Sequence, residues 1–179
     1  MSQAEIASAK PTLAHTYPTR GHMLFDCPLL STYGQEVSFY DYRGRCNLTV
    51  ILAGDMDPAQ KQFFAALSRS YSEIQAQNAE VLLVLPHSPD QAKLIQQHEN
   101  LPFVVLADTD LRAHREGGAL DSINKPSTAV YVTDRFLEVF AAWRTSGDQL
   151  PAIAEIFSWL QYIESQCPEC SQAEWPVDD

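Results

Sequence analysis

The sequence lacks the basic residues on which nucleic-acid and membrane-surface proteins depend. Only 12 Lys and Arg stand against 23 Asp and Glu, which gives a formal net charge of −11. A surface of this charge repels nucleic acid phosphates and anionic lipids. We therefore expect neither nucleic acid nor a membrane as a partner.

Long apolar runs and leader-like segments are also missing. No stretch approaches the roughly 20 apolar residues of a membrane-spanning helix. The opening residues MSQAEIASAKPTLAH lack the basic end and apolar run of a secretory signal, so we expect a cytoplasmic protein. The four cysteines are too few for a disulfide framework in 179 residues, and a reducing cytosol keeps them as thiols.

The periodic patterns predict one domain between two tails. Residues 1–21 show no periodicity and read as a flexible N-terminal arm, residues 22–165 as the domain, and residues 166–179 as a C-terminal tail with paired cysteines. The expected strands are MLFDCPLL and EVSFYDY as a hairpin, then LTVILA, EVLLVLP and PFVVLAD, and finally TAVYVT and LEVFAAW as a second hairpin. With helices between and after them, this order indicates an α/β sandwich around a mixed sheet.

The helix after LTVILA has the clearest start. Asp57 is the expected N-cap, Pro58 the first helical residue, and Gln60 the partner of Asp57 in a capping box. The core side of this helix is a stripe of apolar residues at helical spacing. Its members are Phe63, Phe64, Leu67, Tyr71 and Ile74.

Three segments together resemble the alkyl hydroperoxide reductase and thiol-specific antioxidant family, the peroxiredoxin-like redoxins. They are VSFYDYRGRCNLTVIL, LPFVVLADTDLRAHREGG and KPSTAVYVTDRFLEVFAAW, and the resemblance spans Leu24 to Ile163. It implies a thioredoxin-like fold of the peroxiredoxin type, a three-layer α/β/α sandwich with a mixed central sheet and an N-terminal β-hairpin. It also implies the ancestry of a thiol-dependent antioxidant oxidoreductase.

The resemblance fails at the catalytic cysteine. Peroxidases of this family carry a proline, a threonine and the peroxidatic cysteine in the loop and first helical turn after the first core strand, where the helix N-terminus and an arginine lower the thiol pKa. The matching segment here is GDMDPAQKQ, a degenerate loop with Asp55, Met56, Asp57 and Pro58. We expect Asp57 to accept the first-turn N–H groups, and the protein not to be a standard peroxidase.

Two further features of the sequence each have two interpretations. Pro126 either matches the cis-proline of thioredoxin-like proteins or ends a loop before a strand. The aspartate pairs Asp55/Asp57 and Asp108/Asp110 follow core strands and either hold Mg²⁺ in a phosphotransfer enzyme or cap helices. Capping is favoured, because no glycine-rich phosphate loop is present.

The C-terminal pair Cys167 and Cys170 has three candidate uses. It is the attacking and resolving pair of a thiol-disulfide oxidoreductase with a thiol-redox protein partner, or half of a zinc site, or an exposed reduced turn. The other ligands of such a zinc site come from a second copy in a homodimer, from Cys27 and Cys46, or from a histidine. Nearby glutamates raise the expected thiol pKa. Cys27 and Cys46 are expected to be structural, and the five histidines, which lack metal-type spacing, to lie on the surface or in loops.

Overall fold

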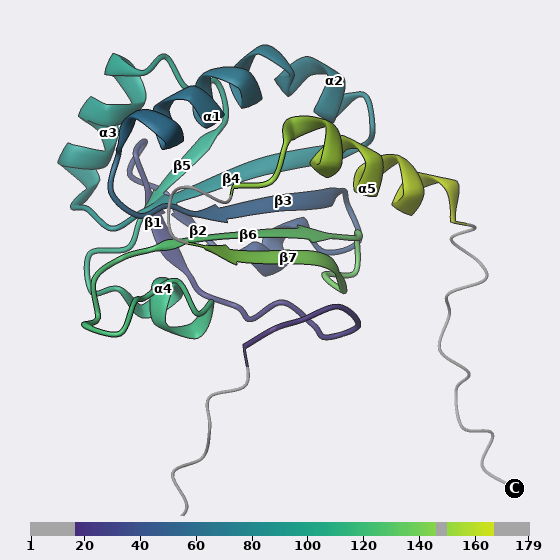
Figure 1. Ribbon diagram of the computed structural model, residues 1–179, viewed down its shortest axis with the longest axis horizontal. Coiled ribbons are helices and arrows are strands. Elements are labelled where there is room, and N and C mark those ends of the chain that lie inside the picture. Colours follow the sequence, from purple (N-terminus) through teal and green to yellow (C-terminus); the bar gives the residue numbers. More distant parts are fainter. Residues whose placement is uncertain (1–16, 146–149, 167–179) are drawn as a thin grey trace, which may run out of the picture.

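A computed structural model describes residues 17–145 and 150–166. In this part of the chain a seven-stranded sheet has the order β2-β1-β5-β4-β3-β6-β7 (Figure 1). Its strands are β1 (Leu29–Ser31), β2 (Glu36–Val37), β3 (Asn47–Leu52), β4 (Ala79–Leu85), β5 (Val104–Ala107), β6 (Thr128–Thr133) and β7 (Val139–Thr145). The helices are the 3-10 helix η1 (Phe39–Tyr42) and the α-helices α1 (Pro58–Arg69), α2 (Tyr71–Gln75), α3 (Pro89–His98), α4 (Arg112–Glu116) and α5 (Ile153–Ser165).

The centre of the sheet is parallel and its flanks are antiparallel. β3, β4 and β5 run parallel, while β1 is antiparallel to β5, and β6 is antiparallel to both β3 and β7. Every residue of β3 is buried, because both faces of a central parallel strand are covered. The carboxyl ends of β3, β4 and β5 therefore lie at one edge, where α1, α3 and α4 begin.

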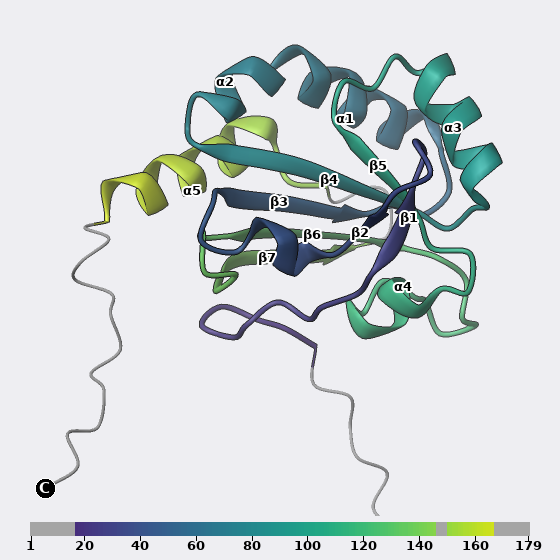
Figure 2. The same ribbon diagram turned by 180° about the vertical axis from the view of Figure 1, so that it is seen from behind.

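Two apolar cores lie on opposite faces of the sheet and give the predicted three layers. One core joins the sheet to α1, α2, α3 and α5, and the other joins it to α4, η1 and the segment before β1. Figures 1 and 2 show the first set of α-helices on one side of the strands and α4 on the other. The pairing of β1 with β2 confirms the expected N-terminal hairpin, and the combination of parallel and antiparallel pairs confirms the mixed sheet.

Three elements differ from the sequence prediction. Of the predicted strand MLFDCPLL only Leu29 and Leu30 belong to a strand, because β1 is Leu29–Ser31. The predicted strand EVSFYDY ends at Val37, because a capping box between Ser38 and Asp41 starts η1 at Phe39. The helical stripe from Phe63 to Ile74 is divided between α1 and α2, since Ser70 leaves the helical geometry. Ile74 is still buried in the same core.

The N-terminal end of the described chain contacts the domain. The Gly21 N–H donates to the Val139 carbonyl at 2.8 Å, and the Arg20 guanidinium lies 5.1 Å from the ring centroid of Trp159. Residues 17–21, which the sequence assigned to an arm, are thus held against β7 and α5. No helix in the ranges 17–145 and 150–166 is long and apolar enough to cross a membrane.

Candidate functional site

The loop between β3 and α1 lies at the carboxyl edge of the sheet, as the sequence predicts. α1 begins at Pro58, and Asp57 is its N-cap with an extended backbone. The Asp57 carboxylate accepts the Gln60 N–H at 2.8 Å. The predicted helix start and its aspartate cap are therefore confirmed.

The donors that a helix N-terminus usually offers to an anion are nearly all engaged here. An α-helix leaves its first four N–H groups without partners inside the helix. The Asp57 N–H donates to the Asp55 carbonyl at 2.8 Å, Pro58 has no N–H, and Gln60 donates to Asp57. Only Ala59 remains of the four, so the α1 N-terminus is a poor anion site.

Gln60 is the buried polar residue of the first turn. The capping box also predicts that its side chain accepts the Asp57 N–H, and this part of the prediction is wrong, because that N–H donates to the Asp55 carbonyl. Gln60 is 2% exposed and its side chain does not turn back to the cap. Its Nε2 instead lies 2.6 Å from Thr128 Oγ1 on β6, and the same oxygen accepts the Gly54 N–H at 3.1 Å. Gln60 Oε1 is buried without a partner in the described part of the chain.

A spacing in the sequence could have located Gln60. It precedes Phe64 by four residues and Leu67 by seven, so it continues the buried stripe of the helix. Gln60 was predicted to be a capping partner only because it follows Asp57 by three residues in the sequence. In the structure the Gln60 side chain reaches β6, and the Asp57 N–H donates to the Asp55 carbonyl instead.

The loop before β6 closes the site from the other side. Gly54 packs so tightly there that an added Cβ would lie 3.0 Å from the Pro126 carbonyl oxygen. Lys125 and Asp55 form an ion pair with an N–O distance of 2.5 Å. The described residues contain no cis peptide bond, so the cis interpretation of Pro126 is wrong and the loop-ending one agrees with the structure.

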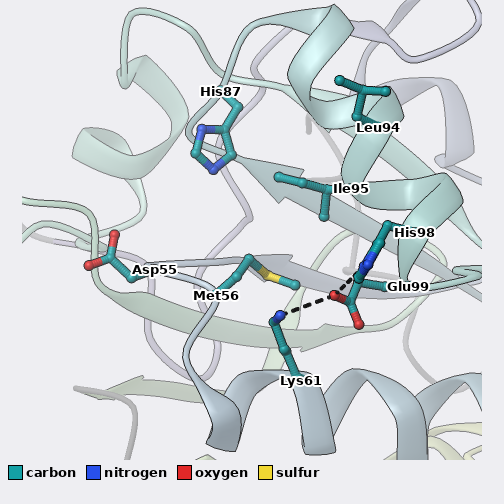
Figure 3. A pocket seen from close by; sticks show the side chains of 8 residues that line it. All are labelled: Asp55, Met56, Lys61, His87, Leu94, Ile95, His98 and Glu99. Atoms are coloured by element: carbon teal, nitrogen blue, oxygen red, sulfur yellow. Dashed lines mark hydrogen bonds and ion pairs between the residues drawn. The ribbon is translucent and has the colours of Figure 1, made fainter.

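A groove of about 610 Å³ opens beside this loop, between α1 and α3. Met56 and Ile95 approach each other across its middle (Figure 3). At one end Glu99 pairs with Lys61 at 3.3 Å and with His98 at 3.1 Å. The hydrogen bond from His98, with help from Lys61, lowers the pKa of Glu99. Its lining residues are Asp55, Met56, Lys61, His87, Leu94, Ile95, His98 and Glu99.

The four strand-end aspartates do not converge on a metal. Asp55 pairs with Lys125, Asp57 caps α1, and Asp110 accepts the Arg112 N–H at 3.3 Å. Asp108 points into the protein instead, and its two oxygens accept the N–H groups of Ala113 and His114. Residues 17–145 and 150–166 contain no group of three metal-binding side chains.

His114 corrects the expectation that every histidine lies on the surface or in a loop. It is fully buried in α4. Its Nδ1 lies 2.6 Å from Asp108 Oδ2, and its Nε2 lies 2.9 Å from the carbonyl oxygen of Ala53. Burial alone would raise the pKa of Asp108, but hydrogen bonds from His114 and from backbone N–H groups outweigh it and lower that pKa.

The cysteines within the described residues lie away from α1. Cys27 is fully buried in the core on the opposite face of the sheet. Burial raises the pKa of its thiol, although the Arg112 Nε–H donates to its sulfur at 3.3 Å. Cys46 is half-buried beside the same core, and burial and Glu80 raise its thiol pKa. Cys167 and Cys170 lie outside the described residues.

The mixed sheet with its helices and the loop before α1 define a thioredoxin-like protein of the peroxiredoxin type. Residues 21–140 match the AhpC/TSA family, and the chain belongs to that family, as predicted.

Solved structures support the fold at low sequence identity. Peroxidoxin BcpB from Mycobacterium tuberculosis is 13% identical with a TM-score of 0.73, over 82% of this chain and 99% of the other. Mycobacterium tuberculosis AhpC is 17% identical with a TM-score of 0.73, over 87% and 99%. Enterococcus faecalis AhpC is 17% identical with a TM-score of 0.72, over 81% and 92%. None of the curated proteins matches this chain.

Proposed function

We propose that this protein is a peroxiredoxin-like binding module that has lost the peroxidatic cysteine and does not act as a peroxidase. The observation that carries the proposal is the Gln60–Thr128 contact of 2.6 Å at the first turn of α1. The Gln60 amide lies in the first turn of the helix, where the family's peroxidases carry their reactive thiol, and it is hydrogen-bonded to the Thr128 hydroxyl of β6. Neither group attacks a peroxide, because thiol peroxidases need a thiolate.

The surroundings of Gln60 support the same conclusion. The Asp57 carboxylate holds the N–H that would stabilise an anionic sulfur, and Lys125 is paired with Asp55. Cys27 belongs to the core on the other face, with a raised thiol pKa. A protonated and buried thiol on the wrong side of the sheet is a poor replacement nucleophile.

The groove between α1 and α3 is the binding site of this proposal. Met56 and Ile95 give it an apolar middle, and charged groups stand at its ends. Its volume of about 610 Å³ is within the range of small-ligand sites. An apolar centre with a few polar groups suits a small molecule, or one side chain of a partner protein, with an apolar body.

A peroxide assay tests the loss of the peroxidase. With thioredoxin, thioredoxin reductase and NADPH, we expect no peroxide-dependent NADPH oxidation above the blank. Gln60→Cys should remain slow to form a sulfenic acid that dimedone traps. Gln60→Cys combined with Asp57→Thr should react faster, because the helix N–H groups are freed from a carboxylate. Turnover by the unaltered chain at the rate of an AhpC measured in parallel would refute the proposal.

A fluorescent probe tests the groove. Anilinonaphthalene sulfonate has apolar rings and one sulfonate, and we expect it to bind the folded chain at one site. Ile95→Glu puts a carboxylate in the middle of the groove and should weaken binding about tenfold or more. The control Ile123→Glu makes the same change at an exposed residue outside the groove. Equal binding by both variants would place the probe elsewhere.

The spacing of Cys167 and Cys170 in the sequence supports a second candidate, a thiol-disulfide oxidoreductase. The Cys167 thiolate would attack a disulfide of a thiol-redox protein. Cys170 would then displace the reduced partner and leave a Cys167–Cys170 disulfide. Reduction of a disulfide substrate that is lost in Cys167→Ser would favour this candidate. Zinc in native mass spectrometry at one ion per homodimer, lost in the same variant, would favour the zinc-stabilised dimer instead.

A further inference from the structure

A second pocket lies along the outer edge of the sheet, apart from the groove between α1 and α3. It encloses about 300 Å³, and the two share no lining residue. Residues 140–144 of β7 all line it, and because side chains alternate between the two faces of a strand, the pocket follows the edge of β7. We call it the edge pocket. The side chains that matter for its chemistry are Arg20, Phe140, Trp143, Arg144, Glu155 and Trp159.

The edge of β7 is open beside this pocket. β7 is the last strand of the sheet. Within residues 17–145 and 150–166, the backbone hydrogen bonds on its outer side join the Gly21 N–H to the Val139 carbonyl and the Val139 N–H to the His22 carbonyl, both at 2.8 Å. Val139 is the first residue of the strand, so the backbone groups farther along that side have no partner among these residues. An edge of this kind accepts a further segment of chain.

Partly exposed aromatic rings from β7 and α5 meet at the edge pocket. The ring centroid of Phe140 lies 6.2 Å from that of Tyr162, which lies 5.9 Å from that of Trp159. Phe140 and Trp159 are half-buried, and Tyr162 is 44% exposed. An aromatic side chain that covers these rings removes apolar area from water, which favours its binding.

Two guanidinium groups stand at the same pocket without a carboxylate partner. Arg20 lies 5.1 Å from the ring centroid of Trp159, and Arg144 lies 5.6 Å from that of Tyr17. Neither arginine forms an ion pair with another described residue. A guanidinium stacked on a ring keeps N–H groups at its rim that bind a carboxylate. Of the described residues that line the pocket only Glu155 is acidic, so the pocket is locally positive in a chain of net charge −11.

Residues 167–179 of the same chain have the chemistry that complements this pocket. They contain Trp175 and no Lys or Arg, and they follow directly on Gln166 at the end of α5. Trp159 and Gln166 are about 10 Å apart along the helix at about 1.5 Å per residue, whereas an extended segment from 167 to 175 spans up to about 30 Å. Trp175 therefore reaches the pocket. The acidic residues of this segment are Glu169, Glu174, Asp178 and Asp179.

We propose that residues 167–179 bind back to the edge pocket and occupy it as an intramolecular ligand. Trp175 lies against the aromatic rings of β7 and α5, and the Glu174 carboxylate pairs with Arg20. Attachment to α5 gives the segment an effective concentration of about a millimolar, so it binds in preference to a separate protein of the same chemistry. A partner segment with an aromatic and an acidic side chain then has to displace residues 167–179.

Indole NMR signals of the full chain, kept reduced, test this contact. Trp175→Ser should shift the indole signal of Trp159. Arg20→Gln should move the Trp175 signal toward its position in a free peptide of residues 165–179, and raised salt should do the same. Arg115→Gln, at an exposed arginine of α4 outside the pocket, is the matched control and should leave both signals in place.

Two results would overturn the contact within one chain. The first is a Trp175 signal of the unaltered chain that coincides with that of the free peptide. The second is a shift of Trp159 that disappears on about tenfold dilution, because an intramolecular contact does not depend on concentration whereas a contact with a second copy does.

A peptide added in solution tests whether the segment closes the pocket. We expect a labelled peptide of residues 168–179, with Cys170→Ser, to bind the Trp175→Ser chain about fivefold or more tightly than the unaltered chain, whose own segment competes with it. Arg20→Gln in the Trp175→Ser chain should weaken this binding, and Arg115→Gln should not. Equal affinity for the Trp175→Ser and unaltered chains, or no saturable binding to the former, would refute the proposal.

Discussion

Replacing Thr128 by valine should expose how much the site loop depends on one hydroxyl group. Thr128 Oγ1 accepts both the Gly54 N–H at 3.1 Å and Gln60 Nε2 at 2.6 Å, and the residue is 1% exposed. Valine has nearly the same shape and removes only the acceptor. Two buried N–H groups then lose their partner.

The size of the effect follows from these contacts. A buried donor left unpaired costs about 1–3 kcal/mol, so Thr128→Val should lower the free energy of unfolding by about 2–4 kcal/mol. Thr128→Ser keeps the hydroxyl and loses one methyl group, at a cost of about 1 kcal/mol. Gln60→Leu should be close to neutral in the unaltered chain, because it also removes the unpaired buried Oε1.

A double-mutant cycle isolates the contact. In the Thr128→Val background, Gln60→Leu should restore about 1–2 kcal/mol, because it removes one of the two unpaired donors. Urea unfolding of the four proteins, with equal slopes against urea concentration, measures each free energy. Equal losses in Thr128→Val and Thr128→Ser, or no coupling between positions 60 and 128, would show that this contact does not hold the loop.

Three further predictions follow from single groups. Asp57→Ala should cost about 1 kcal/mol in urea unfolding because the cap is lost, whereas Asp57→Asn keeps an acceptor and should cost less than half as much; equal losses would contradict the capping role. The pKa of Asp108 is lowered by folding, so its contribution to stability is present above its unfolded value of about 3.9 and is lost as the pH falls through the folded pKa. The stability advantage over Asp108→Asn should therefore shrink below about pH 4, and a constant advantage down to full protonation would refute the assignment. Cys27 is buried with a raised thiol pKa, so iodoacetamide should label it at neutral pH roughly a hundredfold more slowly in the native protein than in urea, as measured by peptide mapping; similar rates would show that its burial does not protect it.

Local patterns predicted the elements that depend on neighbours along the chain. The start of α1 could be predicted because Asp57 and the Gln60 N–H that its side chain accepts are three residues apart. β3 could be predicted because LTVILA is a run of strand length with almost only apolar residues, and every residue of β3 is buried. The same kind of reasoning failed for the segment Phe39–Tyr42, where aromatic residues favour a strand but a capping box starts a helical turn. The cap there involves only Ser38 and Asp41, so a closer reading of the spacing could have found it.

The amino-acid sequence was enough to predict the family, the order of the seven strands and of the helices α1, α3, α4 and α5, and the absence of a thiol from the segment that follows β3. The tertiary structure alone decided what occupies the site, because its contacts join residues that are far apart in the chain. Gln60 meets Thr128 at a separation of 68 residues, and Ala53 meets His114 at a separation of 61. Periodicity indicates which side chains turn inward, but the partner of a buried polar group depends on which strands and helices become neighbours, and folding settles that through the packing of the whole sheet.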